Sequence, residues 1–138
     1  MRILALDLGE KRIGLALSDP LGLTAQGLES YSRSAPQKDF DYISRICDEK
    51  KVSKCVVGLP LRLSGEAGPK AQETINWVEQ LKKQLPCEVE TWDERLTTKE
   101  ATRLMIQQGL SRKKRKQKSD QLAAILILQN YLDRYRQT

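Results

Sequence analysis

Acidic residues at three places could build a metal site in this sequence. Asp7 interrupts an apolar run at residues 3–8, where an ionised carboxylate is costly unless it recruits a cation or another partner. Glu94 follows a short alternating run, and Asp120 precedes a long apolar segment. Carboxylates are hard oxygen ligands, and a cluster of them selects Mg²⁺ or Mn²⁺ over softer metals. The pattern indicates a divalent metal site, provided that the fold brings these acids together.

Each acid also has an ordinary structural explanation. Asp7 could cap a turn at the end of its strand. Glu94 could form a surface ion pair with Arg95 or Lys99. Asp120 could stand in the first turn of a helix, where the helix dipole favours an acid. The residue types alone leave these alternatives open.

The composition narrows the chemistry. The chain has 138 residues and no histidine, which excludes Ser-His and Cys-His catalysis and leaves carboxylates, lysines and metals. The three cysteines, Cys47, Cys55 and Cys87, form no C-x-x-C pair, so we expect reduced thiols in a cytoplasmic protein. The length predicts a single domain over residues 1–138, with no membrane span and no targeting segment.

The positive charge is concentrated in one segment. The formal net charge is +6, and residues 112–118 contain six basic residues and no acid, so the rest of the chain is balanced. Such a block could be a solvated loop. It is also typical of a surface that binds the nucleic-acid backbone. The six residues are Arg112, Lys113, Lys114, Arg115, Lys116 and Lys118.

Hydrophobic periodicity predicts an α/β fold. The first two strands form an antiparallel hairpin, a third strand lies at an edge, and a buried strand runs parallel to the first after a helical crossover. The predicted strands are residues 3–8, 13–18, 26–31, 54–60 and 88–92, and the predicted helices are residues 36–51, 69–85, 97–109 and 120–135. Since chemistry collects beyond the carboxyl ends of parallel strands, the acids could converge there.

The last predicted helix has a broad apolar face. This face either packs internally or forms a dimer contact, so we expect a monomer or a weak homodimer. The predicted apolar positions are Leu122, Ala123, Ile125, Leu126, Gln129 and Leu132.

Several short motifs follow one another along essentially the whole chain. They are Leu6-Asp7-Leu8-Gly9, Arg12-Ile13-Gly14, Val57-Gly58-Leu59-Pro60-Leu61, Gly65 with Gly68-Pro69, Asp93-Glu94-Arg95-Leu96-Thr97-Thr98, and Arg112-Lys113-Lys114-Arg115-Lys116 leading to Asp120 and residues 123–129. Each motif is weak alone, but their order and spacing are specific. Together they resemble the YqgF (RuvX) family, a bacterial branch of the RNase H-like, RuvC-related nucleases.

This resemblance implies an RNase H-like fold with a mixed central sheet, whose first strands are antiparallel, flanked by helices. It also implies that Asp7, Glu94 and Asp120 are the catalytic, metal-binding acids. The family is usually assigned to maturation of the 5′ end of precursor 16S ribosomal RNA, with Holliday junction resolution as an older alternative. Many RNase H-like nucleases use four acids, and here Asp93 and Asp19 are weak candidates for the fourth.

The chemistry that follows is a hypothesis of two-metal phosphodiester hydrolysis, in which Mg²⁺ or Mn²⁺ ions about 4 Å apart activate a water and stabilise the leaving oxygen. Arg12, Arg95 and Lys99 could hold phosphates near the acids, and the basic segment would guide the backbone. The family commonly has Asn and Asp after Gly-Leu-Pro-Leu, whereas Arg62 begins that loop here and could add a phosphate contact. The competing hypothesis is a binding module that docks nucleic acid without cutting it.

Overall fold

The computed structural model describes residues 2–62, 64–93 and 112–136, with the side chains of residues 112–120 and 136 outside the described part. The helix predicted over residues 97–109 falls outside the described residues. None of the described helices is long and apolar enough to cross a membrane.

Five strands form one mixed sheet in the order β3-β2-β1-β4-β5. The strands are β1 (Arg2–Leu8), β2 (Arg12–Ser18), β3 (Ala25–Ser32), β4 (Val52–Leu59) and β5 (Glu88–Asp93). β1 pairs antiparallel with β2 and parallel with β4, while β5 continues the parallel half beside β4. β3 lies at the edge beside β2. The predicted hairpin, edge strand and parallel crossover are confirmed.

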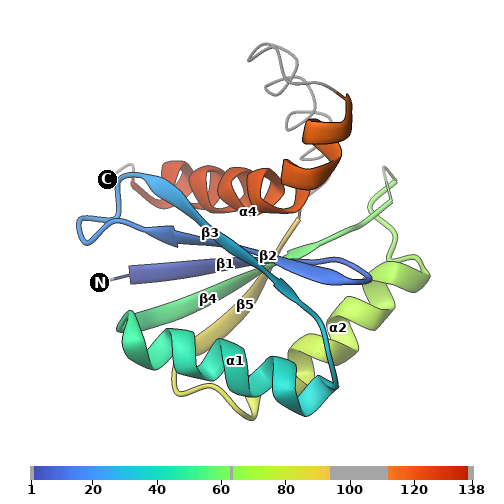
Figure 1. The fold of residues 1–138 in the computed structure, drawn as a ribbon, viewed down its shortest axis with the longest axis horizontal. Helices are drawn as coiled ribbons and strands as arrows, with labels where there is room; N and C mark the ends of the chain where they lie inside the picture. The colour runs from blue at the N-terminus through green and yellow to red at the C-terminus, as the bar shows by residue number, and fades with distance from the viewer. Residues whose placement is uncertain (1, 63, 94–111, 137–138) are drawn as a thin grey trace.

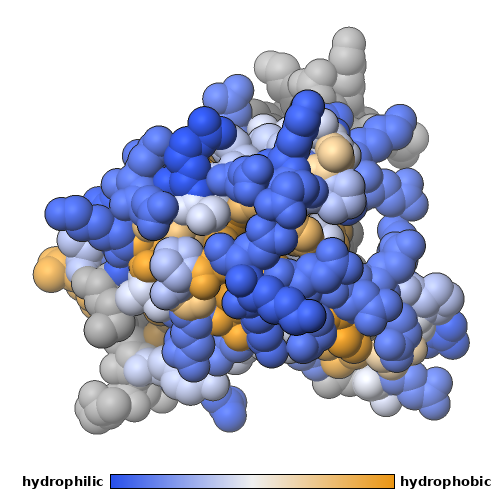
Figure 2. All heavy atoms as spheres, turned by 90° about the horizontal axis from the view of Figure 1, so that it is seen from below, coloured by the Kyte–Doolittle hydropathy of each residue, from blue (hydrophilic) through white to orange (hydrophobic). Residues whose placement is uncertain are grey.

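Three described helices cover the sheet. The helices α1 (Pro36–Glu49) and α2 (Pro69–Lys82) lie on one face, and α4 (Arg112–Arg136) lies on the other (Figure 1). Prolines begin α1 and α2, because the first helical position needs no N–H donor and suits the fixed φ of proline. Viewed from the side of α1 and α2, the surface is mostly hydrophilic, with small apolar areas between the polar side chains (Figure 2).

Helix α4 differs from the sequence prediction in two ways. It begins at Arg112, eight residues before the predicted start at Asp120, so the basic segment is helical and not a loop. The physical reason is that Lys, Arg and Gln are good helix formers, so a charge run does not by itself end a helix.

The face of α4 that packs on the sheet is also rotated from the predicted one. Four of the six predicted positions, Leu122, Ile125, Leu126 and Gln129, are only half-buried. The other two, Ala123 and Leu132, are buried. The segment from Leu122 to Leu128 is apolar all round, so its periodicity does not select one face. The buried residues of α4 are Ala123, Ala124, Ile127, Leu128, Tyr131 and Leu132.

Two packed layers result, one on each face of the sheet. The strands alternate, so that Leu4 and Leu6 point toward α1 and α2, while Ala5 points toward α4. The layer under α1 and α2 is built from large side chains such as Phe40 and Trp77. The layer under α4 contains several alanines, and it includes Ala5, Ala16, Val56, Ala124, Ile127, Leu128, Tyr131 and Leu132.

Candidate active site

Asp7 lies near the carboxyl end of β1 and is half-buried. Ala5 packs in the layer under α4, and residues two apart along a strand share a face. The Asp7 side chain is therefore on the face of the sheet that α4 covers, at the end where the parallel strands finish. The position near the end of the first strand that the sequence indicated for Asp7 is confirmed.

The strands on both sides of Asp7 carry glycine at the same level. Asp7 is paired with Gly14 on β2. On β4, Gly58 follows Val57, which is the partner of Leu6 on β1, so Gly58 is the residue next to Asp7 on that side. Glycine in a strand interior often marks a place where a ligand or another backbone approaches closely. At these two paired positions the neighbouring strands therefore add no side chain, which leaves room for ions and a phosphodiester.

The edge strand is irregular at this same level. Ile13 pairs with Tyr31 and Leu15 with Leu28, so β3 contains one more residue than β2 across this step. This arrangement is a β-bulge, which increases the local twist and is common beside active sites. The bulge bends β3 around the position of Gly14.

The side chains of the other two predicted acids, Glu94 and Asp120, lie outside the described part, so only the elements that precede or contain them can be placed. β5 ends at Asp93, which pairs with Leu59 at the end of β4, and Glu94 is the next residue but lies outside the described residues. Asp120 lies within α4, and its side chain is outside the described part. Because α4 starts at Arg112, the alternative in which Asp120 stands in the first turn of the last helix is wrong.

Asp19, a weak candidate for a fourth metal ligand, serves another purpose. Leu17 pairs with Leu4, so the end of β2 that leads to Asp19 lies beside the amino end of β1, at the opposite edge from Asp7. One carboxylate oxygen of Asp19 accepts hydrogen bonds from the backbone N–H groups of Leu23, at 2.7 Å, and Thr24, at 2.8 Å. The bond from Thr24 is the main reason that the pKa of Asp19 is lowered. Asp19 therefore closes the turn between β2 and β3.

Two amide side chains fix α4 to the edge strand. Gln121 donates from Nε2 to the carbonyl oxygen of Leu28, at 3.0 Å. Gln129 accepts from the backbone N–H of Ala25 at Oε1, at 3.2 Å. Gly27 provides the room, because a Cβ at this position would lie 2.7 Å from the Gln121 side chain. These contacts hold α4 over the face that bears Asp7.

An aromatic cluster lies on the same face beside β5. Trp92 packs edge-on against Tyr131, with ring centroids 5.3 Å apart. Lys54 donates a hydrogen bond to the Tyr131 hydroxyl at 2.9 Å and also lies 3.6 Å from a carboxylate oxygen of Glu90. The hydrogen bond to Tyr131 is the main cause that raises the pKa of Lys54. This cluster ties the second half of α4 to the parallel half of the sheet.

Arg12 lies in a basic depression at the turn between β1 and β2. The depression has a volume of about 670 Å³, and its lining comprises Glu10, Lys11, Arg12, Ser32, Arg33 and Ser34. The sequence pointed to Arg12 but missed Lys11 and Arg33. Lys11 is adjacent to Arg12 and could have been included, whereas Arg33 reaches this place only because β3 ends beside the turn.

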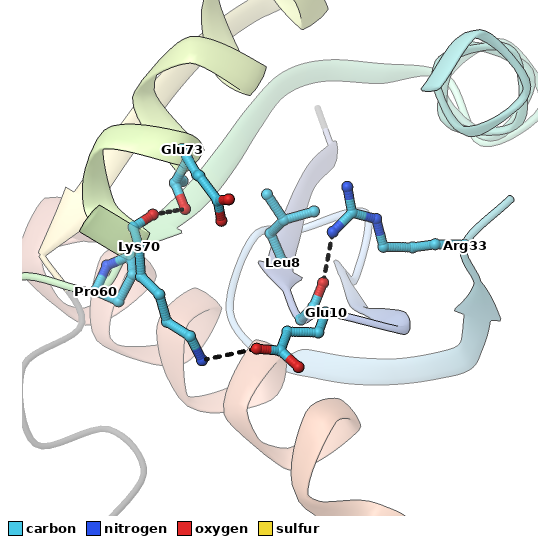
Figure 3. A pocket seen from close by; sticks show the side chains of 8 residues that line it. Leu8, Glu10, Arg33, Pro60, Lys70 and Glu73 are labelled. Atoms are coloured by element: carbon cyan, nitrogen blue, oxygen red, sulfur yellow. Dashed lines mark hydrogen bonds and ion pairs between the residues drawn. The ribbon is translucent and has the colours of Figure 1, made fainter. Parts of the chain in front are cut away.

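Arg33 connects three elements around this turn. Its Nη1 donates to the carbonyl oxygen of Gly9 at 2.7 Å (Figure 3). Its Nε lies 3.7 Å from Asp39, a carboxylate that is only 1% exposed. Asp39 also accepts a hydrogen bond from the backbone N–H of Ser34, at 2.9 Å. Arg33 therefore links the start of α1 to the backbone two residues after Asp7.

Arg62 is exposed in the loop between β4 and α2. The loop is closed by a hydrogen bond from the backbone N–H of Gly65 to the Arg62 carbonyl, at 2.7 Å, and Gly65 has a φ of 92°, which favours glycine. The guanidinium lies over Gly68, where an added Cβ would be 2.7 Å from Arg62 Nε. The cation thus stands at the amino end of α2.

The remaining predicted nucleic-acid contacts are only partly described. The backbone of the basic segment forms the first turns of α4, and the side chains of its six basic residues are outside the described part. Arg95 and Lys99 lie outside the described residues. Within the described residues, no group of three or more acidic or cysteine side chains forms a metal cage. Among the described residues the proposed metal site is thus represented by Asp7.

The cysteines occupy the positions expected of core thiols. Cys47 and Cys55 are buried, Cys87 is half-buried, and all three are free. Cys87 Sγ lies 3.9 Å from Cys47 Sγ. Burial raises the pKa of Cys47 to about 12, so this thiol is protonated at neutral pH.

The fold is that of the RuvC-like, RNase H-like proteins. It is similar to a RuvC from T. thermophilus, solved in complex with a Holliday junction substrate, with a TM-score of 0.62 and 17% identity, covering 100% of this chain and 97% of that one. It is also similar to the fowlpox virus resolvase solved with substrate Holliday junction DNA, with a TM-score of 0.60 and 13% identity, covering 97% of this chain and 98% of that one. The predicted fold class is confirmed.

The sequence comparison assigns the family. A protein from Syntrophomonas wolfei is 50% identical over 133 residues, covering 96% of this chain and 94% of that protein. A protein from Halalkalibacterium halodurans is 48% identical over 136 residues, covering 97% of each. Both have the name "Putative pre-16S rRNA nuclease". The chain belongs to the RuvX family, described as Holliday junction resolvase, whose model matches residues 1–134.

Proposed function

We propose that this protein is a metal-dependent nuclease that hydrolyses phosphodiester bonds in the 5′ region of precursor 16S ribosomal RNA. The observation that supports it best is the position of Asp7. A carboxylate stands at the carboxyl end of the central strand, between Gly14 and Gly58, in a chain of the RuvX family. The substrate is inferred from the name of the relatives.

The donor chemistry of the proposed site fits divalent metal. Asp7, Glu94 and Asp120 would supply only carboxylate oxygens, which are the ligands that Mg²⁺ and Mn²⁺ prefer. Two such ions, when bound, supply an activated water and stabilise the leaving oxygen of the phosphodiester. The chain provides no histidine as a general base, so its own contribution is to hold the carboxylates and orient the substrate.

The glycines on the two strands beside Asp7, Gly14 and Gly58, leave room to orient the substrate. A side chain at position 14 or 58 would point to the same face as Asp7 and compete with the substrate backbone for space. The contacts of α4 with β3 through Gln121 and Gln129 would keep the helix that contains Asp120 at a fixed height over the sheet. We infer that these contacts set the geometry of the acids.

Positive side chains near Asp7 would hold the substrate. We propose that the basic segment of α4 and the pair Lys11 and Arg12 both contribute to this binding. Arg62 at the amino end of α2 adds a further cation near the end of β4. Arg95 and Lys99 stay predictions as phosphate contacts. Backbone contacts of this kind set the register of a strand and make binding sensitive to salt.

The remaining parts of the proposal concern the whole protein. We propose that residues 1–138 act as one RNase H-like nuclease domain, in the cytoplasm where ribosomal RNA is processed, and as a monomer or a weak homodimer. Burial of the apolar face of α4 against the sheet supports the monomer, because that face is occupied within the chain.

The substrate is tested by cleavage of two labelled nucleic acids under the same conditions. One is an RNA that spans the 5′ cleavage region of precursor 16S ribosomal RNA, and the other is a four-way DNA junction. Each is incubated with the purified protein in Mg²⁺ or Mn²⁺ and again with a chelator. The proposal expects cleavage of the RNA that the chelator abolishes, with little or no cutting of the junction.

The other outcomes distinguish the alternatives. Preferential cutting of the junction would replace the RNA substrate with a resolvase function, in line with the family description. Salt-sensitive binding of both nucleic acids without any cutting would contradict the nuclease proposal and favour a binding module. Cleavage that persists in the chelator would contradict the metal site.

A further inference from the structure

Three depressions adjoin one another around the turn that follows β1, and Glu10 and Arg33 line all three. The two beside α2 lie on the face opposite Asp7, because Leu8 and Trp77 pack in the layer under α1 and α2. The third contains Arg12, which alternates with the core residue Ile13 and therefore points to the side of Asp7. Together they make up a cleft that leads from the turn between β1 and β2 to α2, the part beside α2 being drawn in Figure 3. Leu8, which follows Asp7 directly, lies in its wall and points to the opposite side of the sheet from Asp7.

The end of the cleft at the turn is suited to a phosphate. Lys11, Arg12 and Arg33 line it with the hydroxyl groups of Ser32 and Ser34 and with the carboxylate of Glu10, which lies 3.9 Å from Lys70. Lys11 and Arg12 are exposed, whereas Arg33 is held by Gly9 and Asp39, as described above. The two exposed cations are therefore available to an anionic ligand at the surface, and the serines add hydrogen-bonding groups.

The end of the cleft at α2 has a different character. It has a volume of about 530 Å³, which is within the range of about 300–1,000 Å³ typical of small-molecule sites. Leu8, Pro36 and Trp77 give it apolar surface. Glu73, Asn76 and Gln80 supply groups that can hydrogen bond with the edge of a nucleobase.

Trp77 adds an independent sign of a missing partner. Its side chain is 7% exposed, and within the described part of the chain its indole Nε1 is buried without a hydrogen-bond acceptor. Buried polar groups are normally paired, and an unpaired one is costly. Because Nε1 is closed to solvent, a bound base could offer it a carbonyl oxygen only if the side chains around Trp77 moved apart.

One weak contact crosses the cleft. Lys70 of α2 lies 3.9 Å from the carboxylate of Glu10 on the turn, and both side chains are largely exposed, at 74% and 81% (Figure 3). Exposed ion pairs of this kind contribute little to stability. A ligand can therefore replace this contact at small cost.

We propose that the cleft binds an unpaired nucleotide of the substrate strand, with its phosphate at Lys11 and Arg12 and its base between Leu8 and Trp77. This inference rests on the proposed nuclease function. It adds that the substrate is single-stranded beside the point of cleavage, because a base paired in a duplex cannot turn into a cleft on the other side of the sheet. The strand would pass over the turn that follows Asp7.

The proposal is tested by the fluorescence of Trp77. The chain has two tryptophans, so Trp92→Phe leaves Trp77 as the only tryptophan, and Asp7→Asn is added to prevent cleavage. This protein is titrated with a short single-stranded RNA and with the same RNA annealed to its complement as a blunt duplex. We expect the unpaired RNA to change Trp77 emission in a saturable manner and the duplex to leave it unchanged.

The charge of the turn is tested in the same titration. Lys11→Ala combined with Arg12→Ala should weaken binding of the unpaired RNA about tenfold at low salt. The slope of log affinity against log salt concentration should fall by the amount expected for the loss of about one to two phosphate contacts. The matched control is Lys82→Ala with Lys83→Ala, which removes two exposed lysines from the other end of α2. The control should leave the affinity within about twofold.

Two results would contradict the proposal that the cleft binds an unpaired nucleotide. One is RNA binding, measured by anisotropy of a labelled RNA, that leaves Trp77 emission unchanged. The other is an equal response to the duplex. A second measurement avoids the Trp92→Phe substitution: RNA containing 4-thiouridine is cross-linked to otherwise unchanged Asp7→Asn protein, and the attached peptide is identified. Attachment within residues 73–80 supports the cleft, and attachment confined to α4 contradicts it.

These measurements separate the cleft from the nuclease function. Metal-dependent cleavage of RNA without a change in Trp77 emission would contradict nucleotide binding in the cleft and leave the nuclease proposal intact. A change in Trp77 emission in a protein that cuts no nucleic acid would support nucleotide binding in the cleft and contradict the nuclease proposal.

Discussion

The two faces of the sheet are built from side chains of different size. Under α1 and α2, leucines, Phe40 and Trp77 form a thick layer. Under α4, Ala5, Ala16 and Ala124 are part of a thinner layer, so one helix lies close to the strands. Large apolar side chains contribute more burial free energy than alanine does. The thick layer therefore supplies most of the stability, while the thin layer fixes the height of α4 over Asp7.

This difference predicts opposite responses to changes of side-chain size. The thick layer should be damaged by removal of volume, and the thin layer by addition of volume. Substitutions on the two faces can therefore separate stability from the geometry of the site.

The largest loss of stability is expected for Leu6→Ala. Leu6 is 0% exposed in the layer under α1 and α2, and truncation leaves a cavity, so the free energy of unfolding should fall by about 2–5 kcal/mol. Urea denaturation followed by circular dichroism measures the loss. Leu21→Ala is the matched control, because Leu21 is 79% exposed and should change stability little. Equal losses in the two variants would contradict this assignment of the core.

Ala124→Leu is expected to affect function as well as stability. Ala124 is 0% exposed between α4 and the sheet, and a larger side chain there should lower the free energy of unfolding by about 1–3 kcal/mol. It should also displace α4 and reduce the cleavage rate by about tenfold to a hundredfold at a temperature where the variant is folded. Ala67→Leu, at an exposed alanine, serves as the control. Unchanged cleavage in Ala124→Leu would show that the height of α4 is unimportant.

Asp39→Asn tests the link between the thick layer and the turn after β1. The substitution removes the negative charge beside Arg33, and the free energy of unfolding should fall by about 1–2 kcal/mol, since Arg33 is partly exposed. Asp41→Asn in the same helix is the control, because Asp41 is exposed and accepts a hydrogen bond from Gln37 only at the surface. If the two variants unfold at the same urea concentration, Arg33 does not depend on Asp39.

The smallest effect at neutral pH is expected for Cys47→Val. Burial raises the pKa of Cys47 from 9.0 to about 12, so the folded state holds this proton more tightly than the unfolded state. The resulting stability is complete below pH 9 and is lost as the pH rises toward about 12. Cys47→Val should therefore reduce the fall in unfolding free energy between pH 9 and 12, measured by urea denaturation. A slope identical to that of the unchanged protein would indicate that the thiol is solvated.

The sequence was sufficient for the fold because each strand has a local signal. The hairpin glycines, the alternation in β1 and β2 and the prolines that begin α1 and α2 each indicate the element that forms. The start of α4 could not be derived, because a run of Lys and Arg is compatible with a loop and with a helix. Its buried face could not be derived either, because the segment is apolar on all sides.

The site was predictable only in part for a related reason. Asp7 was found because it interrupts an apolar run, which is a local anomaly. Arg33 and Asp39 were missed because their roles arise where β3, α1 and the turn after β1 meet. The glycines beside Asp7 needed the strand register, which no single stretch of sequence defines.

The central claim is that Asp7 serves chemistry while the cations around it serve binding. The most direct test measures the cleavage rate and the affinity of the Asp7→Asn protein for the same precursor RNA, beside those of the unchanged protein. The account predicts that cleavage is lost while the dissociation constant, measured by anisotropy in Ca²⁺ or with a chelator, changes by less than about threefold. Retained cleavage, or a parallel loss of affinity and cleavage in a variant that is still folded, would contradict it.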